Sequence, residues 1–444
     1  MSRPTTGDIA RGVLKLAAPT TMLSLMQAFA LLVETFIAAR LGRGPLAGYA
    51  TVLPFALLLG QMSAGAMGGG VVSAIARALG ARREDEASAM VKHALTIALC
   101  FAGGFILAMV ILPRPILSAI GGEAAAEFGV PFAMVYFGLG AVPAWIANTL
   151  ASVLRGGGRH GIAAKVNTLA WLFSPVLGWL LALEMGMGLI GVGIGFGAAM
   201  WAAAIAQGIV VLRGSAGFRP DFSVPFQGAL FKRILSVGAV ACALAAVSNL
   251  TTILVTAQLK SYGQAAVAAY GVSARLEFLM IPLAFGVGSA LTALVGRAVG
   301  AGDWELARRT AWVGGGMAFG VCAVVGVSVA IFPYAFAGVF ASDPEVQAIA
   351  ALALGCIGPA FAGFGLGMAM YFAAMGAGRM RWPVAAGLSR LGLAVLGGAL
   401  LGETFGMGLV GHFLAVAAGI TAYGLIAAAA VQPREWAPRL LRQT

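Results

Sequence analysis

Apolar stretches of about 20 residues or more recur along the whole chain, and each is long enough to cross a hydrocarbon core about 30 Å thick. Of the 444 residues, 60% are hydrophobic and only 10% are charged, whereas soluble domains carry about 25% charged residues. Lipid accepts only helices or closed barrels, and these stretches show no alternation of period two. The sequence therefore predicts an all-α membrane protein with twelve transmembrane helices, at roughly 12–39, 50–76, 93–112, 129–154, 162–183, 189–212, 234–259, 266–296, 311–333, 346–373, 383–402 and 408–431.

The second half of the chain repeats the first at a spacing of about 220 residues. The segment from Ala47 (AGYATVLPF) matches that from Ala268 (AAYGVSARLEF), and the glycine-rich segment from Gly186 matches the segment from Gly406. Tandem copies predict two pseudo-symmetric six-helix bundles around a central site, as transporters favour. We expect an N-terminal lobe over 1–213, a cytoplasmic linker over 214–231 and a C-terminal lobe over 232–444.

Basic residues fall on alternate loops, which predicts the orientation because Lys and Arg concentrate on the cytoplasmic side. Most of the 28 Lys and Arg residues lie at the N-terminus, in the even-numbered loops and in the C-terminal tail. Arg155 and Arg390 are assigned to these loops, while Arg275 falls inside a predicted span. We expect a multi-pass protein of a bacterial-type inner membrane with both termini in the cytoplasm. This placement explains the net charge of +12 without nucleic-acid binding.

The four Cys and three His residues form no metal-binding or catalytic pattern. Each Cys falls singly in a predicted span without a CxxC motif, and no Ser/His/Asp set is evident. The glycine runs at 68–70 and 156–158 lack the GK[ST] sequence of a phosphate loop. We therefore expect no enzyme, no metal site and no cofactor, and an intramembrane enzyme is a minor alternative.

Short motifs, found in order along essentially the whole chain, resemble those of the multidrug and toxic compound extrusion (MATE) family. They are Leu16-Ala-Ala-Pro19, Gln27, Val33-Glu34-Thr35, Arg40-Leu-Gly42, Leu154-Arg155, Gly158-Arg159, Pro175 and Tyr270-Gly-Val-Ser-Ala-Arg275-Leu-Glu277. The resemblance implies a secondary antiporter whose two bundles rock between outward-facing and inward-facing states. It implies export of organic, often cationic, compounds in exchange for H⁺ or Na⁺.

Glu34 is the candidate coupling residue. Of the 16 acidic residues, only Glu34 and Glu277 lie well inside predicted spans, where charge is costly and usually functional. The resemblance places Glu34 where the family often has an Asp used for cation coupling, and its repeat partner is Val255. Burial favours the protonated form of a carboxyl group, so Glu34 could bind a proton and release it when the cavity wets. The alternative is a carboxyl group near the outer helix end without a transport role.

The chain departs from the family at two positions near this carboxyl group. Some members carry Asn and Asp where this chain has Ala170 and Ser174. A Na⁺ site needs several oxygen ligands, so the departure favours H⁺ over Na⁺ as the coupling ion.

Arg275 and Glu277 are two residues apart on one helix, so they do not face each other and each needs a partner elsewhere. We expect either a structural role in pinning this helix or a place in the cavity wall. Polar side chains also hold membrane helices together. The candidates for the substrate cavity are Gln27, Tyr49, Gln61, Asn148, Asn167, Ser174, Asn249, Tyr270, Arg275 and Glu277.

The leading hypothesis is a cation-coupled exporter of small organic compounds that works as a monomer. An alternative is a flippase or exporter of a lipid-linked saccharide or another amphipathic metabolite. The count of twelve spans and the single interior arginine, Arg275, argue against the flippase. A channel-like protein is a third reading, and the two-lobed repeat argues against it.

Overall fold

The computed structural model describes residues 4–437 of the chain. Twelve of its helices are long and apolar enough to cross a membrane, and they confirm the twelve spans predicted from the sequence. The described residues contain no β-strand. The chain forms two compact units, with changeovers between Ala17 and Ala18 and between Ala239 and Val240. We call Ala18–Ala239 the N-terminal unit, and the residues up to Ala17 together with those from Val240 the C-terminal unit.

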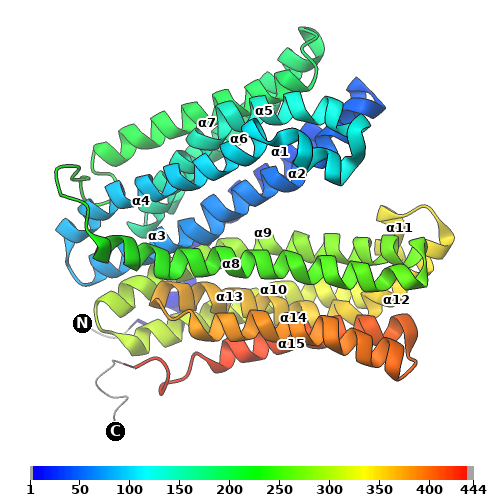
Figure 1. Cartoon of the computed structure of the whole chain (residues 1–444). Coiled ribbons are helices and arrows are strands. Elements are labelled where there is room, and N and C mark those ends of the chain that lie inside the picture. Colours follow the sequence, from blue (N-terminus) through cyan, green and yellow to red (C-terminus); the bar gives the residue numbers. More distant parts are fainter. Residues whose placement is uncertain (1–3, 438–444) are drawn as a thin grey trace. The chain divides into compact units, whose positions relative to one another are not determined.

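The N-terminal unit is organised around one long helix, α5, which contacts α2, α3, α4, α6 and α7. Figure 1 shows these helices from blue to green. Several spans contain a short turn labelled η: η1, η2, η3 and η6 are π-helical, with an extra residue that widens the helix, and η4 and η5 are 3₁₀-helical. The elements are α1 (Thr6–Leu41), α2 (Arg43–Gly60), η1 (Gln61–Ala66), α3 (Met67–Gly80), α4 (Glu84–Ile106), η2 (Leu107–Ile111), α5 (Pro113–Gly156), α6 (His160–Trp179), η3 (Leu180–Glu184), α7 (Leu189–Leu212) and the start of α8 (Gly228–Leu259).

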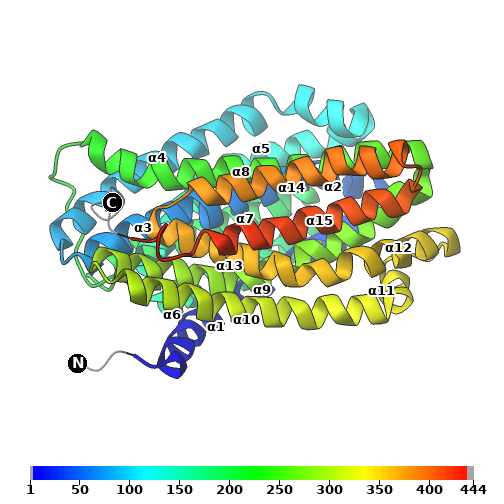
Figure 2. The same cartoon turned by 90° about the horizontal axis from the view of Figure 1, so that it is seen from below.

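The C-terminal unit follows the same order of helices, and α13 contacts α9, α10 and α15. Helices α14 and α15 run side by side in both views of this unit (Figures 1 and 2). Its elements after α8 are η4 (Lys260–Tyr262), α9 (Gln264–Gly300), α10 (Trp304–Ile331), α11 (Pro333–Phe340), α12 (Pro344–Ile357), η5 (Gly358–Ala360), α13 (Phe361–Ala377), α14 (Arg381–Ala399), η6 (Leu400–Thr404) and α15 (Gly408–Ala429).

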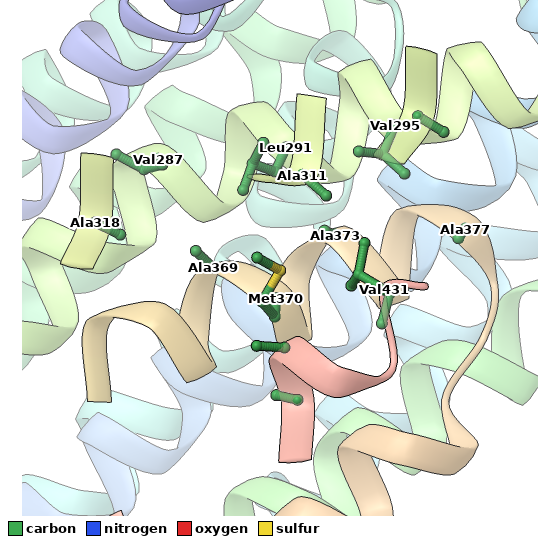
Figure 3. Close-up of a cluster of buried hydrophobic side chains, with 14 of the residues drawn as sticks. Val287, Leu291, Val295, Ala311, Ala318, Ala369, Met370, Ala373, Ala377 and Val431 are labelled. Atoms are coloured by element: carbon green, nitrogen blue, oxygen red, sulfur yellow. The ribbon is translucent and has the colours of Figure 1, made fainter. Parts of the chain in front are cut away.

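The core of the C-terminal unit lies between α9, α10 and α13. Val287, Leu291 and Val295 recur every four residues on one face of α9 and meet an alanine-rich face of α13 (Figure 3). Small residues allow membrane helices to approach closely. Ile9 and Val13 of α1 belong to the same core, so the first turns of α1 are anchored in the C-terminal unit. The lobe boundaries predicted from the sequence, 1–213, 214–231 and 232–444, remain a prediction.

The sequence repeat returns as a repeat of backbone conformation. Two π-helical turns, η3 at Leu180–Glu184 and η6 at Leu400–Thr404, occupy equivalent places before the last helix of each half. Glycines with positive φ recur in the same way: 79° at Gly158 and 68° at Gly378, and 70° at Gly186 and 69° at Gly406. Such angles suit glycine because it has no Cβ. The two six-helix bundles are therefore pseudo-symmetric, as predicted.

Candidate coupling and substrate site

Glu34 lies on α1 inside the N-terminal unit, with only 1% of its surface exposed. The Tyr49 hydroxyl, on α2, donates to Glu34 Oε2 at 3.4 Å, and the Ser174 hydroxyl, on α6, donates to Oε1 at 3.3 Å. Three helices thus bring together three residues that the sequence singled out. The carboxyl group is buried among these helices.

No basic side chain neutralises this carboxyl group. Among residues 4–437, Glu34 has no ion pair with Lys, Arg or His. Its partners are two hydroxyl groups, each of which can donate a hydrogen bond or accept one. The two hydroxyl groups can therefore donate hydrogen bonds to the ionised carboxylate. When the carboxyl group is protonated, one hydroxyl can rotate its O–H bond and accept a hydrogen bond from it. The Ala170 side chain, also buried on α6, adds no polar group.

An aromatic cluster covers the Tyr49 side of the site. The Tyr49 and Phe132 rings lie 5.7 Å apart, and Phe132 in turn meets Tyr136 at 5.4 Å. Tyr136 stacks on Phe196 with ring centroids 4.0 Å apart and planes 4° apart. Large buried aromatic side chains exclude water and hold the Tyr49 ring in place. The sequence analysis did not single out Tyr136. The one feature that could have indicated it is a tyrosine hydroxyl inside a predicted span.

Two of the predicted cavity residues of the N-terminal unit join helices instead. Asn148 Nδ2 donates to Ser63 Oγ at 2.8 Å, and Gln207 Nε2 donates to Asn167 Oδ1 at 2.7 Å. These bonds fit the structural alternative of polar contacts between membrane helices. Gln27 and Gln61 are half-buried, and within residues 4–437 neither side chain has a hydrogen-bond partner. Both remain candidates for ligand binding.

The assignment of Arg390 to a cytoplasmic loop was wrong, whereas Arg155 lies in the last turn of α5, beside the loop to which it was assigned. Arg155 is 4% exposed near the end of α5, where its Nη2 donates to the Ala64 carbonyl at 3.2 Å and to Ser152 Oγ at 2.8 Å. Arg390 is 7% exposed within α14. The count of basic residues in loops treated every arginine near a helix end as interfacial, whereas these two point into their units.

Arg390 is the partner that Glu277 needed. Its guanidinium forms an ion pair with the Glu277 carboxylate of α9 and lies over the Phe364 ring, 5.6 Å from the centroid. Tyr270 lies seven residues before Glu277 on the same face of α9 and is 5% exposed. The C-terminal unit thus contains a second acidic centre, in which Arg390 is buried and Glu277 is partly buried.

The expectation that Arg275 is held by a partner was wrong. Its side chain is exposed and forms no ion pair within residues 4–437. The side chain lies on an exposed side of α9, where no carboxylate of the described residues comes within ion-pair distance. Asn249, on α8, is half-buried and donates to the Ala245 carbonyl of its own helix at 3.0 Å.

The described residues contain no cluster of three or more His, Cys, Asp or Glu side chains suited to a metal ion. The polar groups around Glu34 are a carboxyl group and two hydroxyls, which can exchange a proton or contact an organic cation. The site therefore has the chemistry of reversible proton and cation binding.

Comparison with known proteins agrees with this arrangement. The MatE family matches residues 19–180 and again 239–400, so one family pattern covers both halves of the chain. A Deinococcus radiodurans relative named "Probable multidrug resistance protein NorM" is 27% identical across 95% of this chain and 94% of its own length. A "FAD transporter" of Shewanella oneidensis is 22% identical across 71% of each chain.

Among solved structures, the Vibrio cholerae MATE transporter VcmN superposes with a TM-score of 0.89 over 99% of this chain and 98% of its own, at 20% identity. That likeness shows the fold, with its twelve membrane-spanning helices. The family match over most of the chain goes further, because its members are transporters and not enzymes. The chain therefore belongs to the MatE family and is a multi-pass membrane transporter of the multidrug and toxic compound extrusion type.

Proposed function

We propose that this transporter is a proton-coupled antiporter that exports organic cations by alternating access, with Glu34 as the group that exchanges proton for substrate. One observation carries the proposal: a carboxyl group 1% exposed, hydrogen-bonded by the Tyr49 and Ser174 hydroxyls and without a basic partner in residues 4–437. An unpaired charge in a low-dielectric interior is costly. Glu34 therefore needs a proton or a cationic ligand in its buried state.

The same requirement makes proton and substrate alternatives to each other. A cationic compound can neutralise the ionised carboxylate, and a proton that binds there removes the charge that held the compound. Such competition gives antiport, since each ligand lowers the affinity of the other. The side chains near Glu34 favour H⁺ over Na⁺, because a sodium ion needs several oxygen ligands and Ala170 supplies none.

Helix α1 connects the Glu34 carboxyl group to residues of the C-terminal unit. Its first turns pack in the core of the C-terminal unit, while Glu34 belongs to the N-terminal unit. Pro19 lies two residues beyond the changeover and removes a backbone hydrogen bond of the helix. A change of charge at Glu34 acts on a helix that both units hold and that bends most easily near Pro19.

A second candidate function is export of an anionic amphipathic compound. The Shewanella oneidensis relative is named a FAD transporter, and Arg275 of this chain is an exposed cation within the apolar α9. An arginine without an acidic partner suits phosphate groups. A lipid-linked saccharide shares with FAD the phosphate groups that an arginine can bind.

The experiment is transport in proteoliposomes that contain wild-type protein. One arm offers the organic cation ethidium and the other offers FAD, each under a pH gradient or a sodium gradient. We expect an acidic interior to drive ethidium uptake, while a sodium gradient at constant pH has no effect. Uptake driven by sodium alone would contradict the proton assignment. Uptake of FAD without uptake of ethidium would favour the second candidate.

A further inference from the structure

A cavity of 390 Å³ lies in the C-terminal unit, where the start of α1, the first turns of α10 and the segment after α15 meet. Its lining includes Thr6, Glu305, Arg308, Arg309, Trp312 and Val431. Figure 3 shows Val431 beside the core residues of α13, so one wall rests on the packed core. The volume falls within the range of small-ligand sites, about 300–1,000 Å³. Nothing in the proposed transport mechanism uses this cavity.

Hydrogen bonds from α10 fix the walls. Arg308 Nη1 donates to the Trp436 carbonyl at 2.9 Å, and Arg309 Nη2 donates to the Pro4 carbonyl at 3.0 Å. Trp312 Nε1 donates to the Val431 carbonyl at 3.2 Å. The chain before α1 and the chain after α15 are thus both held against α10. The cavity is a built feature of this unit.

Both arginines keep donors for a ligand. Each makes one hydrogen bond within residues 4–437, and neither forms an ion pair there. A guanidinium has five N–H donors, arranged to meet two oxygens of a phosphate at once. Among the described residues of the lining, Glu305 is the one acidic side chain, beside two arginines. The cavity therefore favours an anion.

The cavity also spans a sharp change in polarity along α10. Arg308 and Arg309 stand one turn before Trp312, and no charged residue follows from Ala311 to Ile331. The edge of the hydrocarbon layer on α10 thus falls within the cavity. Trp312 is 47% exposed, and tryptophan is typical of the membrane interface. The pattern of basic residues predicts this edge to be cytoplasmic, where anionic lipids gather.

We propose that this cavity binds the headgroup of an anionic phospholipid. Arg308 and Arg309 hold the phosphate oxygens, while Trp312 and Val313 contact the glycerol and the first acyl carbons. A soluble anion would use the arginines alone, whereas a lipid uses both the charged and the apolar part of the lining. The chain's own residues 438–444 are a poorer match because they contain Arg439 and Arg442.

The N-terminal unit carries different side chains at the equivalent place. The residues of α4 equivalent to Arg308 and Trp312 are Ser88 and Lys92. Ser88 Oγ donates to the Arg219 carbonyl at 2.6 Å, and Lys92 Nζ donates to the Val224 carbonyl at 3.1 Å. The segment that leads into α8 therefore lies directly on α4. Only the C-terminal copy combines arginines with an exposed tryptophan at this place.

The test measures lipid binding to the delipidated full-length protein, by native mass spectrometry and by thermal unfolding with added lipid. We expect phosphatidylglycerol to bind and to raise the unfolding temperature, while phosphatidylcholine does neither. The double variant Arg308→Gln/Arg309→Gln should bind phosphatidylglycerol about thirtyfold more weakly, since two juxtamembrane charges are lost. The charge-preserving variant Arg308→Lys/Arg309→Lys should retain most of the binding.

The matched control is Arg82→Gln/Arg83→Gln, an adjacent exposed arginine pair in the turn before α4 of the N-terminal unit. It should bind phosphatidylglycerol as the wild type does. Equal loss in both double variants would show unspecific attraction and overturn the site. Stabilisation by glycerol 3-phosphate equal to that by the lipid would show a soluble-anion site and also overturn it. Because Arg308 also holds the Trp436 carbonyl and Arg309 also holds the Pro4 carbonyl, the unfolding temperature of each variant without lipid is the check on folding. Unchanged lipid binding in the single variant Arg309→Gln would contradict the proposal.

Discussion

In the N-terminal unit the buried carboxyl group of Glu34 meets two neutral hydroxyls, whereas in the C-terminal unit the carboxylate of Glu277 meets the guanidinium of Arg390. The two centres share two pairs of equivalent helices, although Glu34 lies on α1 and Glu277 lies on α9, the equivalent of α2. Tyr49 on α2 corresponds to Tyr270 on α9, and Ala170 on α6 corresponds to Arg390 on α14. The carboxyl groups themselves are not at equivalent positions, since Glu34 corresponds to Val255. The position that holds Ala170 in the N-terminal unit, however, holds in the C-terminal unit the arginine that pairs with Glu277.

This comparison assigns different work to the two centres. A carboxylate paired with arginine has no need of a proton or a cationic ligand, so the C-terminal centre is suited to joining α9 and α14. The N-terminal centre lacks such a partner within residues 4–437 and is suited to exchange. A repeat in which one copy is fixed and the other is labile gives the transporter one titratable switch instead of two.

The largest effect on stability should come from breaking the fixed centre. Arg390→Met leaves Glu277 charged and unpaired, with 17% of its side chain exposed, and should cost about 3–5 kcal/mol of unfolding free energy. Denaturant unfolding in detergent measures this. The double variant Arg390→Met/Glu277→Met should recover most of the loss. Arg275→Met, a matched change of an exposed arginine, should stay within about 0.5 kcal/mol, and a large loss there would revive a structural role for Arg275.

A smaller effect should follow from a polar contact that only the N-terminal unit has. Gln207 and Asn167 are buried and hydrogen-bonded, while the equivalent residues of the C-terminal unit are Ala427 and Gly387. Gln207→Ala orphans the Asn167 amide and should cost about 1–3 kcal/mol. Adding Asn167→Ala should lower that cost, because no unsatisfied partner then remains. Thermal unfolding of the three variants checks this, and strictly additive losses would contradict it.

The smallest effect concerns the turn between the second and third spans of each half. Arg82 has φ of 58°, the one positive value at a non-glycine residue among residues 4–437, and its counterpart Gly302 has φ of 80°. Gly302→Ala should therefore cost about 1 kcal/mol. Arg82→Gly should raise stability by about 0.5 kcal/mol at most, since glycine gains more chain entropy on unfolding. If the two variants changed the unfolding free energy by equal and opposite amounts, backbone strain alone would determine both changes.

Much of the fold could be predicted because hydropathy and repeat spacing act over whole segments. The twelve spans follow from the length and polarity of each run, and the pseudo-symmetry follows from motifs such as those at Gly186 and Gly406. Part of the site could also be predicted, because a carboxyl group inside a membrane span is energetically costly and is usually functional. Glu34, Tyr49 and Ser174 were predicted individually, and the structure brings them together.

Pairings between distant residues could not be predicted in this way. Glu277 and Arg390 lie 113 residues apart, and no periodicity links them. Counting arginines by loop placed Arg390 outside the membrane, because the method reads charge without knowing where a side chain points. The stacking of Tyr136 on Phe196 depends on how α5 packs against α7, and this packing cannot be predicted from a single sequence.

The most direct test of the account replaces the labile carboxyl group itself. Glu34→Gln keeps the shape of the side chain and removes the titratable proton, so it should fix the site in its proton-loaded form. In proteoliposomes with an acidic interior, ethidium uptake should fall to background.

Glu34→Asp should keep part of the activity with a shifted pH profile, because the carboxyl group remains and only its reach changes. The control Glu184→Gln, an exposed carboxyl group at the end of η3, should transport normally. Ethidium uptake by Glu34→Gln at the wild-type rate under the same gradient would contradict the central claim that Glu34 couples proton and substrate.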